Sequence, residues 1–331
     1  MPVAPELFRA LGALCEPPAP GHERIAEALG LPRLADRADH TEVFVFQLVP
    51  YASVYLGAEG MLGGEAADRV AGFWRALRLA PPPEPDHLAA LLGLYAALGE
   101  AERDERDAAR RLLWRESRRA LLWEHLLTWT VPYARAVSAG APAPYAVWGA
   151  LLAEALLAEA ADLEPPPTPS LHLRDAAALP DAGADAEALV RAVLTPARSG
   201  LLLTRWDLAR GARALGLGLR AGERAFALRS LLGQDPPATL GFLAGEAAAW
   251  AARHGENKTA LGEVGRHWRE RAEATRALLL ELERAAGEVA HGRVPAGPRS
   301  DEGATREAGA PGGGGPPSVS EGEVTVHAAR R

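Results

Sequence analysis

Apolar residues recur along most of the chain at the spacing of an amphipathic helix. After Asp86 the sequence places large apolar residues three or four positions apart, at Leu88, Leu91, Leu92, Tyr95 and Leu98. Aspartate is a favoured N-cap, and glycine often follows the last turn of a helix. The pattern therefore predicts a helix that starts at Asp86 and stops near Gly99.

Further helices are predicted on both sides of a proline-rich stretch. We expect one from about residue 104 to 130, ended by Pro132, and one from Pro144 to the triple proline that starts at Pro165. After this stretch, Ala/Leu-rich periodicity predicts five more helices, near residues 185–195, 200–215, 221–232, 237–254 and 258–290.

Residues 41–56 (TEVFVFQLVPYASVYL) depart from the helical pattern. Their β-branched and aromatic side chains favour a strand by propensity, but Pro50 divides the segment and no partner strand is evident elsewhere. Because a lone strand cannot satisfy its backbone, we expect a short helix up to about Gln47 and then an extended turn from Pro50 to Ser53.

Composition supports an all-α fold with a sizeable core. The chain has 331 residues, is 48% hydrophobic, and uses mainly alanine and leucine among its apolar residues. We expect a helical bundle at residues 1–165, a Pro/Ala-rich linker at 166–184 and an additional C-terminal helical layer at 185–290. Residues 291–331 contain too few large apolar side chains to offset the entropy of ordering, and we expect a disordered tail there.

Charge is distributed unevenly along the chain, whose net charge is −7. Residues 1–190 carry 16 arginines against 27 acidic residues, a net of −11, whereas residues 191–290 carry 15 basic against 11 acidic residues, a net of +4. An acidic N-terminal part attracts cationic ligands and disfavours phosphate backbones. The alternative interpretation is that these charges lie on ordinary solvated helix faces.

The residues of catalytic or metal sites are not grouped in this sequence. There is one cysteine, Cys15, and the nine histidines include no pair at helical ligand spacing and no H-E-x-x-H motif. No G-x-S-x-G motif is present, and the G-x-G-x-x-A string at residues 216–221 follows a predicted helix rather than the strand that a dinucleotide fold requires. We expect no enzyme activity, no catalytic residue and no metal ligand.

A nucleic-acid site is a possible alternative at residues 200–232, which have the pattern of a helical hairpin. Residues 191–230 carry eight arginines against Asp207 and Glu223, a local net of +6 that suits phosphates. An apolar hairpin with arginines on its wet face is the commoner structure, and the whole chain is acidic. We expect no nucleic acid as a partner. The alternative function is a helical regulator that binds nucleic acid through residues 200–232.

Two clusters have the composition of a binding site. The first is Pro50 to Leu56, with Tyr51, Ser53 and Tyr55, followed by four glycines up to Gly64. The second is Glu84-Pro85-Asp86-His87, which follows the triple proline at residues 81–83. Packed tyrosines and a capped helix start would explain both clusters equally well on composition alone.

Three segments together resemble one protein family. PYASVYLGAEGMLGG at 50–64, EPDHLAALLGLYAAL at 84–98 and WEHLLTWTVPY at 123–133 resemble the TorD family of molybdoenzyme maturation chaperones, which includes DmsD and is related to the NarJ-type chaperones. The most specific mark of this family is an E-P-x-D-H motif, and here Glu84 to His87 supply its residue types without the intervening residue. Trp129 and Pro132 also fit the family pattern.

The resemblance implies a cytoplasmic, non-enzymatic chaperone. Such proteins bind the twin-arginine signal peptide and the apo form of a molybdopterin oxidoreductase, and assist cofactor insertion before export or membrane assembly. Molybdopterin guanine dinucleotide belongs to the client, so we expect no permanently bound cofactor; whether a nucleotide binds stays open. The N-terminal residues lack a cationic start followed by an apolar run, and we expect neither a targeting signal nor a transmembrane segment.

The resemblance also implies where the peptide binds. A leader of two arginines and an apolar helix requires carboxylates beside an apolar surface, with tyrosine faces on which guanidinium groups stack. The predicted site consists of Tyr51, Ser53, Tyr55, Glu84, Pro85, Asp86, His87 and Trp129. An interaction scaffold that binds the apoenzyme without recognising its leader is a further alternative.

Overall fold

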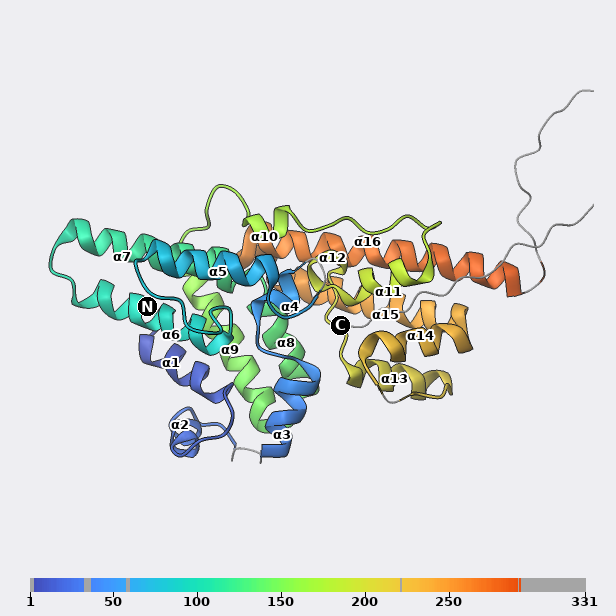
Figure 1. Cartoon of the computed structure of the whole chain (residues 1–331), viewed down its shortest axis with the longest axis horizontal. Helices are drawn as coiled ribbons and strands as arrows, with labels where there is room; N and C mark the ends of the chain where they lie inside the picture. The colour runs from blue at the N-terminus through green and yellow to red at the C-terminus, as the bar shows by residue number, and fades with distance from the viewer. Residues whose placement is uncertain (1–2, 33–36, 58–59, 221, 291, 293–331) are drawn as a thin grey trace, which may run out of the picture. The chain divides into compact units, whose positions relative to one another are not determined.

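The computed structural model describes residues 3–32, 37–57, 60–220, 222–290 and 292 (Figure 1). Within these ranges the backbone forms helices and one isolated β-bridge but no strand, which confirms the predicted all-α class. The described residues all fall in one unit, Met1–Arg293. The predicted disordered tail lies outside the described residues, except for Gly292.

The N-terminal helices pack in pairs, α1 against α6, α6 against α7, and α8 against α9. The helical spacing after residue 86 is confirmed, because Leu88, Leu91 and Tyr95 all point into the core. The elements are α1 Pro5–Leu14, α2 His22–Ala28, α3 Arg37–Thr41, the π-helix η1 Glu42–Gln47, α4 Ala52–Leu56, α5 Gly64–Ala76, α6 Leu88–Asp104, α7 Ala108–Ala120, the π-helix η2 Leu121–Leu126, α8 Thr130–Gly140 and α9 Ala143–Asp162.

The helix predicted from about residue 104 to 130 is confirmed over residues 108–126, where α7 continues into the π-helix η2, but its predicted ends are wrong. Asp104 ends α6, and Asp107 starts α7 by accepting a hydrogen bond from the Arg110 N–H at 2.9 Å. The chain breaks again at Trp129, before α8. Pro132 does not end a helix but lies in the first turn of α8, where its missing N–H has no intrahelical partner to lose.

The C-terminal helices are dominated by the pairing of α15 with α16, which lie side by side in Figure 1. The elements are α10 Leu171–Arg174, α11 Ala186–Leu194, α12 Pro196–Ser199, α13 Arg205–Leu215, α14 Arg224–Gln234, α15 Pro236–Glu256 and α16 Lys258–Ala290. Gly216 ends α13 in the left-handed conformation. The glycines of the G-x-G-x-x-A string at residues 216–221 therefore separate two helices, α13 and α14.

The helix predicted for residues 200–215 starts later than expected. Gly200 has φ of +75° and ends α12, and a Cβ there would lie 2.4 Å from the Ala272 nitrogen of α16. The next three leucines are non-helical and buried, and Thr204 and Asp207 then form a capping box that starts α13. Close backbone packing, which periodicity does not report, ends the helix here.

Side chains from the two halves of the chain share one hydrophobic core. The Trp268 indole of α16 donates to the Thr128 carbonyl at 2.8 Å, and the Gln47 side-chain oxygen accepts from the Arg205 N–H at 3.0 Å. The predicted division into domains at residues 166–184 stays a prediction; that stretch includes the short helix α10, whose His172 and Leu173 are buried.

A buried ion pair ties three of the N-terminal helices together. The Arg118 guanidinium of α7 contacts Glu159 of α9 at 2.6 Å and Glu102 of α6 at 2.8 Å. Glu159 also accepts from the Tyr95 hydroxyl and from the Val3 N–H. Because each charge is paired and hydrogen-bonded, the network is tolerated in the core, and it fixes the order of these helices.

Candidate peptide-binding site

The two sequence clusters lie against each other in the structure. Tyr51 and His87 form an isolated antiparallel β-bridge. The Ala52 N–H donates to the Asp86 carbonyl at 3.1 Å, and the Leu88 N–H donates to the Pro50 carbonyl at 2.8 Å. Backbone hydrogen bonds therefore join the turn before α4 to the turn before α6. The extended turn predicted from Pro50 to Ser53 is confirmed at Tyr51 but is wrong at Ala52 and Ser53, which begin α4.

Asp86 supports α4 rather than starting α6. Its carboxylate is buried and accepts from the Ser53 N–H, in the first turn of α4, at 3.0 Å. The N-cap of α6 is His87, whose Nδ1 accepts from the Ala89 N–H at 3.1 Å. The N-cap predicted at Asp86 is therefore wrong, because this carboxylate is used across the bridge instead of along its own helix.

Ser53, Tyr55 and Trp129 are also buried. The Tyr55 ring stacks on Trp129 with 5.1 Å between centroids and meets the Tyr133 ring edge-on at 5.4 Å. The Tyr55 hydroxyl donates to the Val49 carbonyl at 2.9 Å, and burial raises its pKa. These aromatic rings form the interior on which the α4 turn rests, so they position a surface site instead of forming its surface.

The other four predicted site residues, Tyr51, Glu84, Pro85 and His87, are at least partly exposed. The Tyr51 and His87 rings meet edge-on at 4.7 Å. Burial, and then a hydrogen bond with the Glu84 carboxylate, raise the pKa of Tyr51 to about 12. Burial lowers the pKa of His87, which favours the neutral imidazole.

Glu84 and His87 line a surface cavity of about 460 Å³, which we call the acidic groove. It is lined by Arg9, Ala13, Glu16, Pro82, Pro83, Glu84, His87, Ala89, Ala90 and Gly93.

The acidic groove suits a cationic side chain. Glu16 and Glu84 face one cation, Arg9, which is already paired with Glu100 at 2.5 Å. The floor consists of small residues, and a Cβ added at Gly93 would meet no atom within 4 Å. Arg9, Glu16 and Gly93 were not among the predicted site residues. Arg9 and Glu16 reach the motif only through the packing of α1 on α6, which the sequence does not show.

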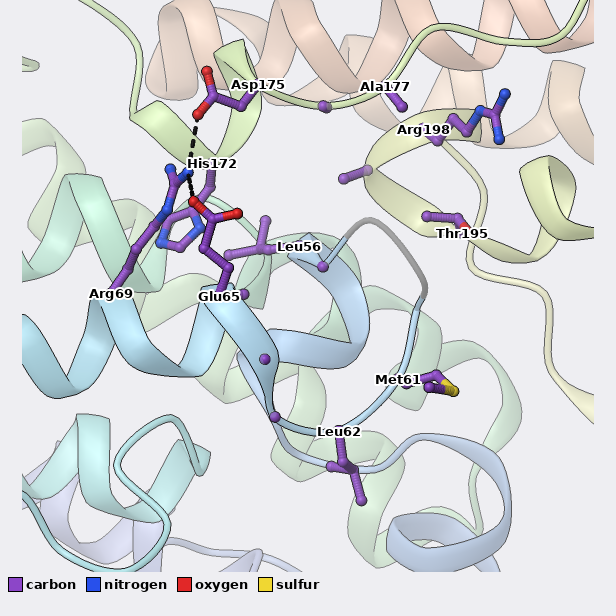
Figure 2. A pocket seen from close by; sticks show the side chains of 16 residues that line it. Leu56, Met61, Leu62, Glu65, Arg69, His172, Asp175, Ala177, Thr195 and Arg198 are labelled. Carbon is purple, nitrogen blue, oxygen red and sulfur yellow. Dashed lines mark hydrogen bonds and ion pairs between the residues drawn. The ribbon is translucent and has the colours of Figure 1, made fainter.

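A second hollow surface lies over residues 45–66. Its main cavity of about 480 Å³ is drawn in Figure 2, and a neighbouring cavity of about 420 Å³ shares Met61 and Thr195 with it. We call the two together the basic groove, because five arginines line it against three acidic residues: Arg69, Arg191, Arg198, Arg205 and Arg224 against Glu65, Asp175 and Glu223. Residues 50–64 and four of these arginines had each been noted in the sequence, but not that they line one surface.

Several arginines of the 200–232 hairpin are engaged within the protein. Arg210 pairs with Asp207 and Glu246 at 2.7 and 2.8 Å, and Arg229 pairs with Glu187 at 2.6 Å. Arg224 donates to the Leu203 carbonyl at 2.8 Å. These contacts account for three of the eight charges that suggested a phosphate-binding surface.

Among the residues with described positions, no three His, Cys, Asp or Glu side chains are grouped so that they could hold a metal ion. Cys15 is buried, and burial raises the pKa of its thiol. Within the ranges that the structure describes, no helix combines the length and apolar character needed to cross a bilayer.

The fold is all-helical, and the E-P-D-H turn borders the acidic groove. Residues 16–135 match the model of the family described as nitrate reductase delta subunit, and this match is consistent with a NarJ/TorD-type maturation chaperone. The predicted resemblance is thereby confirmed. The family consists of chaperones for molybdoenzymes rather than catalysts. No curated protein matches the chain.

Proposed function

We propose that this protein is a cytoplasmic chaperone that binds the twin-arginine leader of a molybdopterin oxidoreductase and keeps the apoenzyme ready for cofactor insertion. The proposal rests on the family match over residues 16–135 and on the acidic groove beside the family motif. In this proposal molybdopterin guanine dinucleotide is carried by the client, and the chaperone holds no permanent cofactor.

The acidic groove would receive a leader arginine. A guanidinium can pair with the Glu84 and Glu16 carboxylates while its aliphatic stem lies along the small residues of α6. The partly exposed Tyr51 ring lies beside both Glu84 and His87, where it could contact the same side chain. Ser53, Tyr55, Asp86 and Trp129 would act indirectly, by holding this turn in place.

Calorimetric titration with the synthetic leader of a neighbouring-gene oxidoreductase tests the proposal. We expect Glu84→Gln to weaken binding about fivefold at low salt and less at high salt, because exposed ion pairs are screened. Glu281→Gln, an exposed carboxylate on α16, serves as the matched control and should leave binding unchanged. Absence of leader binding at high micromolar concentration by the folded protein would refute the proposal.

A steric variant tests the same groove without changing charge. Gly93→Leu should fill the acidic groove and weaken leader binding at every salt concentration, because the space above Gly93 is open. Gly72→Leu is the control, since Gly72 is exposed on α5 and a Cβ there also meets nothing within 4 Å. Tight binding of the mature apoenzyme by a protein that ignores its leader would instead support the scaffold alternative.

A further inference from the structure

The basic groove carries an unusual amount of exposed apolar surface. Val45, Phe46, Met61 and Leu62 are each 52% to 62% exposed, and all of them line one of its two cavities. Isolated exposed apolar residues are ordinary, but large apolar side chains gathered around adjoining cavities mark an interaction surface. Figure 2 shows Met61 and Leu62 on the segment that leads into α5.

The walls of this groove are held by specific contacts. Val45 and Phe46 lie on η1, whose last residue, Gln47, accepts from the Arg205 and Trp206 N–H groups at the start of α13. The Arg205 Nε donates to the Gly222 carbonyl at 3.1 Å. Because η1 is joined in this way to the C-terminal helices, the exposed side chains project from a fixed surface.

The charges around the groove select the chemistry of its occupant. Arg191 is exposed, and its side chain makes no hydrogen bond or ion pair with any described residue. Arg198 uses Nε to donate to the Ala178 carbonyl and also lines the groove. Glu65 and Asp175 are both paired with Arg69, as the dashed lines in Figure 2 show. Glu223 is the remaining carboxylate of the groove, and it faces Arg191, Arg205 and Arg224, so the net available charge is positive.

We propose that the basic groove binds an amphipathic helix from the mature part of the client, one that carries carboxylates beside its apolar face. Apolar side chains at helical spacing would enter the two cavities between Phe46, Met61 and Leu62, and an Asp or Glu would pair with Arg191. A twin-arginine segment is disfavoured here by charge and favoured at the acidic groove. This inference rests on the proposed chaperone function.

Overlapping 18-residue peptides that cover the client's mature sequence, together with its leader, provide the probes. We expect the protein to bind peptides whose apolar face is flanked by Asp or Glu, and Phe46→Ser and Met61→Ser to weaken them about tenfold each. Leu113→Ser is the matched control, because Leu113 is 67% exposed on α7 and lines neither cavity. Leader binding should be unchanged in all three variants.

A charge exchange tests the predicted ion pair. Arg191→Glu should weaken the acidic peptides about threefold to tenfold, with the larger loss at low salt. Replacing the peptide carboxylate with lysine should restore binding to this variant. The inference is overturned if no mature-sequence peptide binds, or if the groove variants leave peptide binding unchanged. It is also overturned if the groove variants weaken leader binding as much as they weaken binding of the mature-sequence peptides. The first two results would leave leader binding, and with it the proposed function, intact.

Discussion

The acidic and basic grooves differ in how the chain builds them and in the charge they present. The acidic groove is formed by residues between Arg9 and Gly93, and its carboxylates belong to the turn that carries the family motif and to the end of α1. The basic groove joins residues 45–69 to residues 172–225, and arginines outnumber acidic residues along it. Under the two proposals above, one client would be recognised at two places by segments of opposite charge.

Each groove also rests on a buried polar contact of its own. Asp86 lies behind the turn of the acidic groove, where it binds the Ser53 N–H. At the basic groove, His172 lies in the wall, and Gln47, the last residue of η1, accepts from the Arg205 N–H. These buried supports differ from the surface side chains that would touch a partner, and mutation separates the two roles.

Acidification should destabilise the interior next to the basic groove most strongly. Burial, with the nearby His172, lowers the pKa of His125 to about 3, and burial with the charge of Arg69 lowers that of His172 to about 4. The rings lie 5.7 Å apart, and Glu65, Asp175 and Phe73 are the other neighbours. Below pH 6.5 the unfolded chain would bind protons that the folded chain excludes, so stability should fall between about pH 6.5 and 4.

Urea unfolding of wild type and His172→Gln between pH 7.5 and 4.5 measures this effect. The wild-type free energy of unfolding should fall with decreasing pH, and the variant should lose up to about 1.4 kcal/mol less per pH unit, the contribution of one proton. Burial also lowers the pKa of His254 and His267 to about 4. Because both proteins contain these histidines, the free energy of unfolding should still depend on pH in the variant. Parallel curves would show that His172 is protonated equally in both states.

The period of apolar residues predicted the helices better than it predicted the surface cavities that form between them. The α6 leucines and the α9 start near Pro144 follow from local spacing and local chemistry, and both are confirmed. The basic groove could not be predicted, because its lining residues Leu56 and Arg198 lie more than a hundred positions apart and meet only in the folded chain. No sequence period distinguished the π-helix η1 from an ordinary helix.

The motif illustrates the same limit within a short segment. The sequence identified Glu84 to His87 as unusual, but Asp86 before a helical run is also typical of an N-cap. Only the pairing of residues 51 and 87 places the Asp86 carboxylate on α4 and leaves Glu84 on the surface. A local pattern indicated the chemistry of this turn correctly while leaving the direction of its side chains undetermined.

Asp86→Ala should lower the free energy of unfolding by about 2–3 kcal/mol, because it leaves the buried Ser53 N–H without its charged acceptor. Asp86→Asn keeps an acceptor oxygen and should lose less. Glu84→Ala, on the exposed side of the same turn, should stay within about 0.5 kcal/mol of wild type. Urea denaturation at pH 7.5 checks all three, and equal losses for Asp86→Ala and Glu84→Ala would contradict this division of the motif.

Gln47→Ala makes the corresponding change beneath the basic groove. We expect a loss of about 1 kcal/mol, smaller than for Asp86→Ala, because a neutral amide oxygen is a weaker acceptor than a carboxylate. Amide hydrogen exchange should increase at Arg205 and Trp206, whose N–H groups donate to the Gln47 side chain, and stay unchanged at Ser53. Increased exchange at Ser53 as well would show that the two grooves are not supported independently.

The smallest expected effect is a gain in stability at the floor of the acidic groove. Gly93→Ala should raise the free energy of unfolding by about 0.5–1 kcal/mol, because alanine restricts the unfolded chain and its methyl group meets no atom within 4 Å in the interior of α6. Gly149→Ala, measured in the same way, should be destabilised, since its methyl group would lie 2.7 Å from the Ala134 carbonyl oxygen of α8. If Gly93→Ala proved as damaging as Gly149→Ala, the groove above α6 would have to be filled by protein, and no leader arginine could enter it.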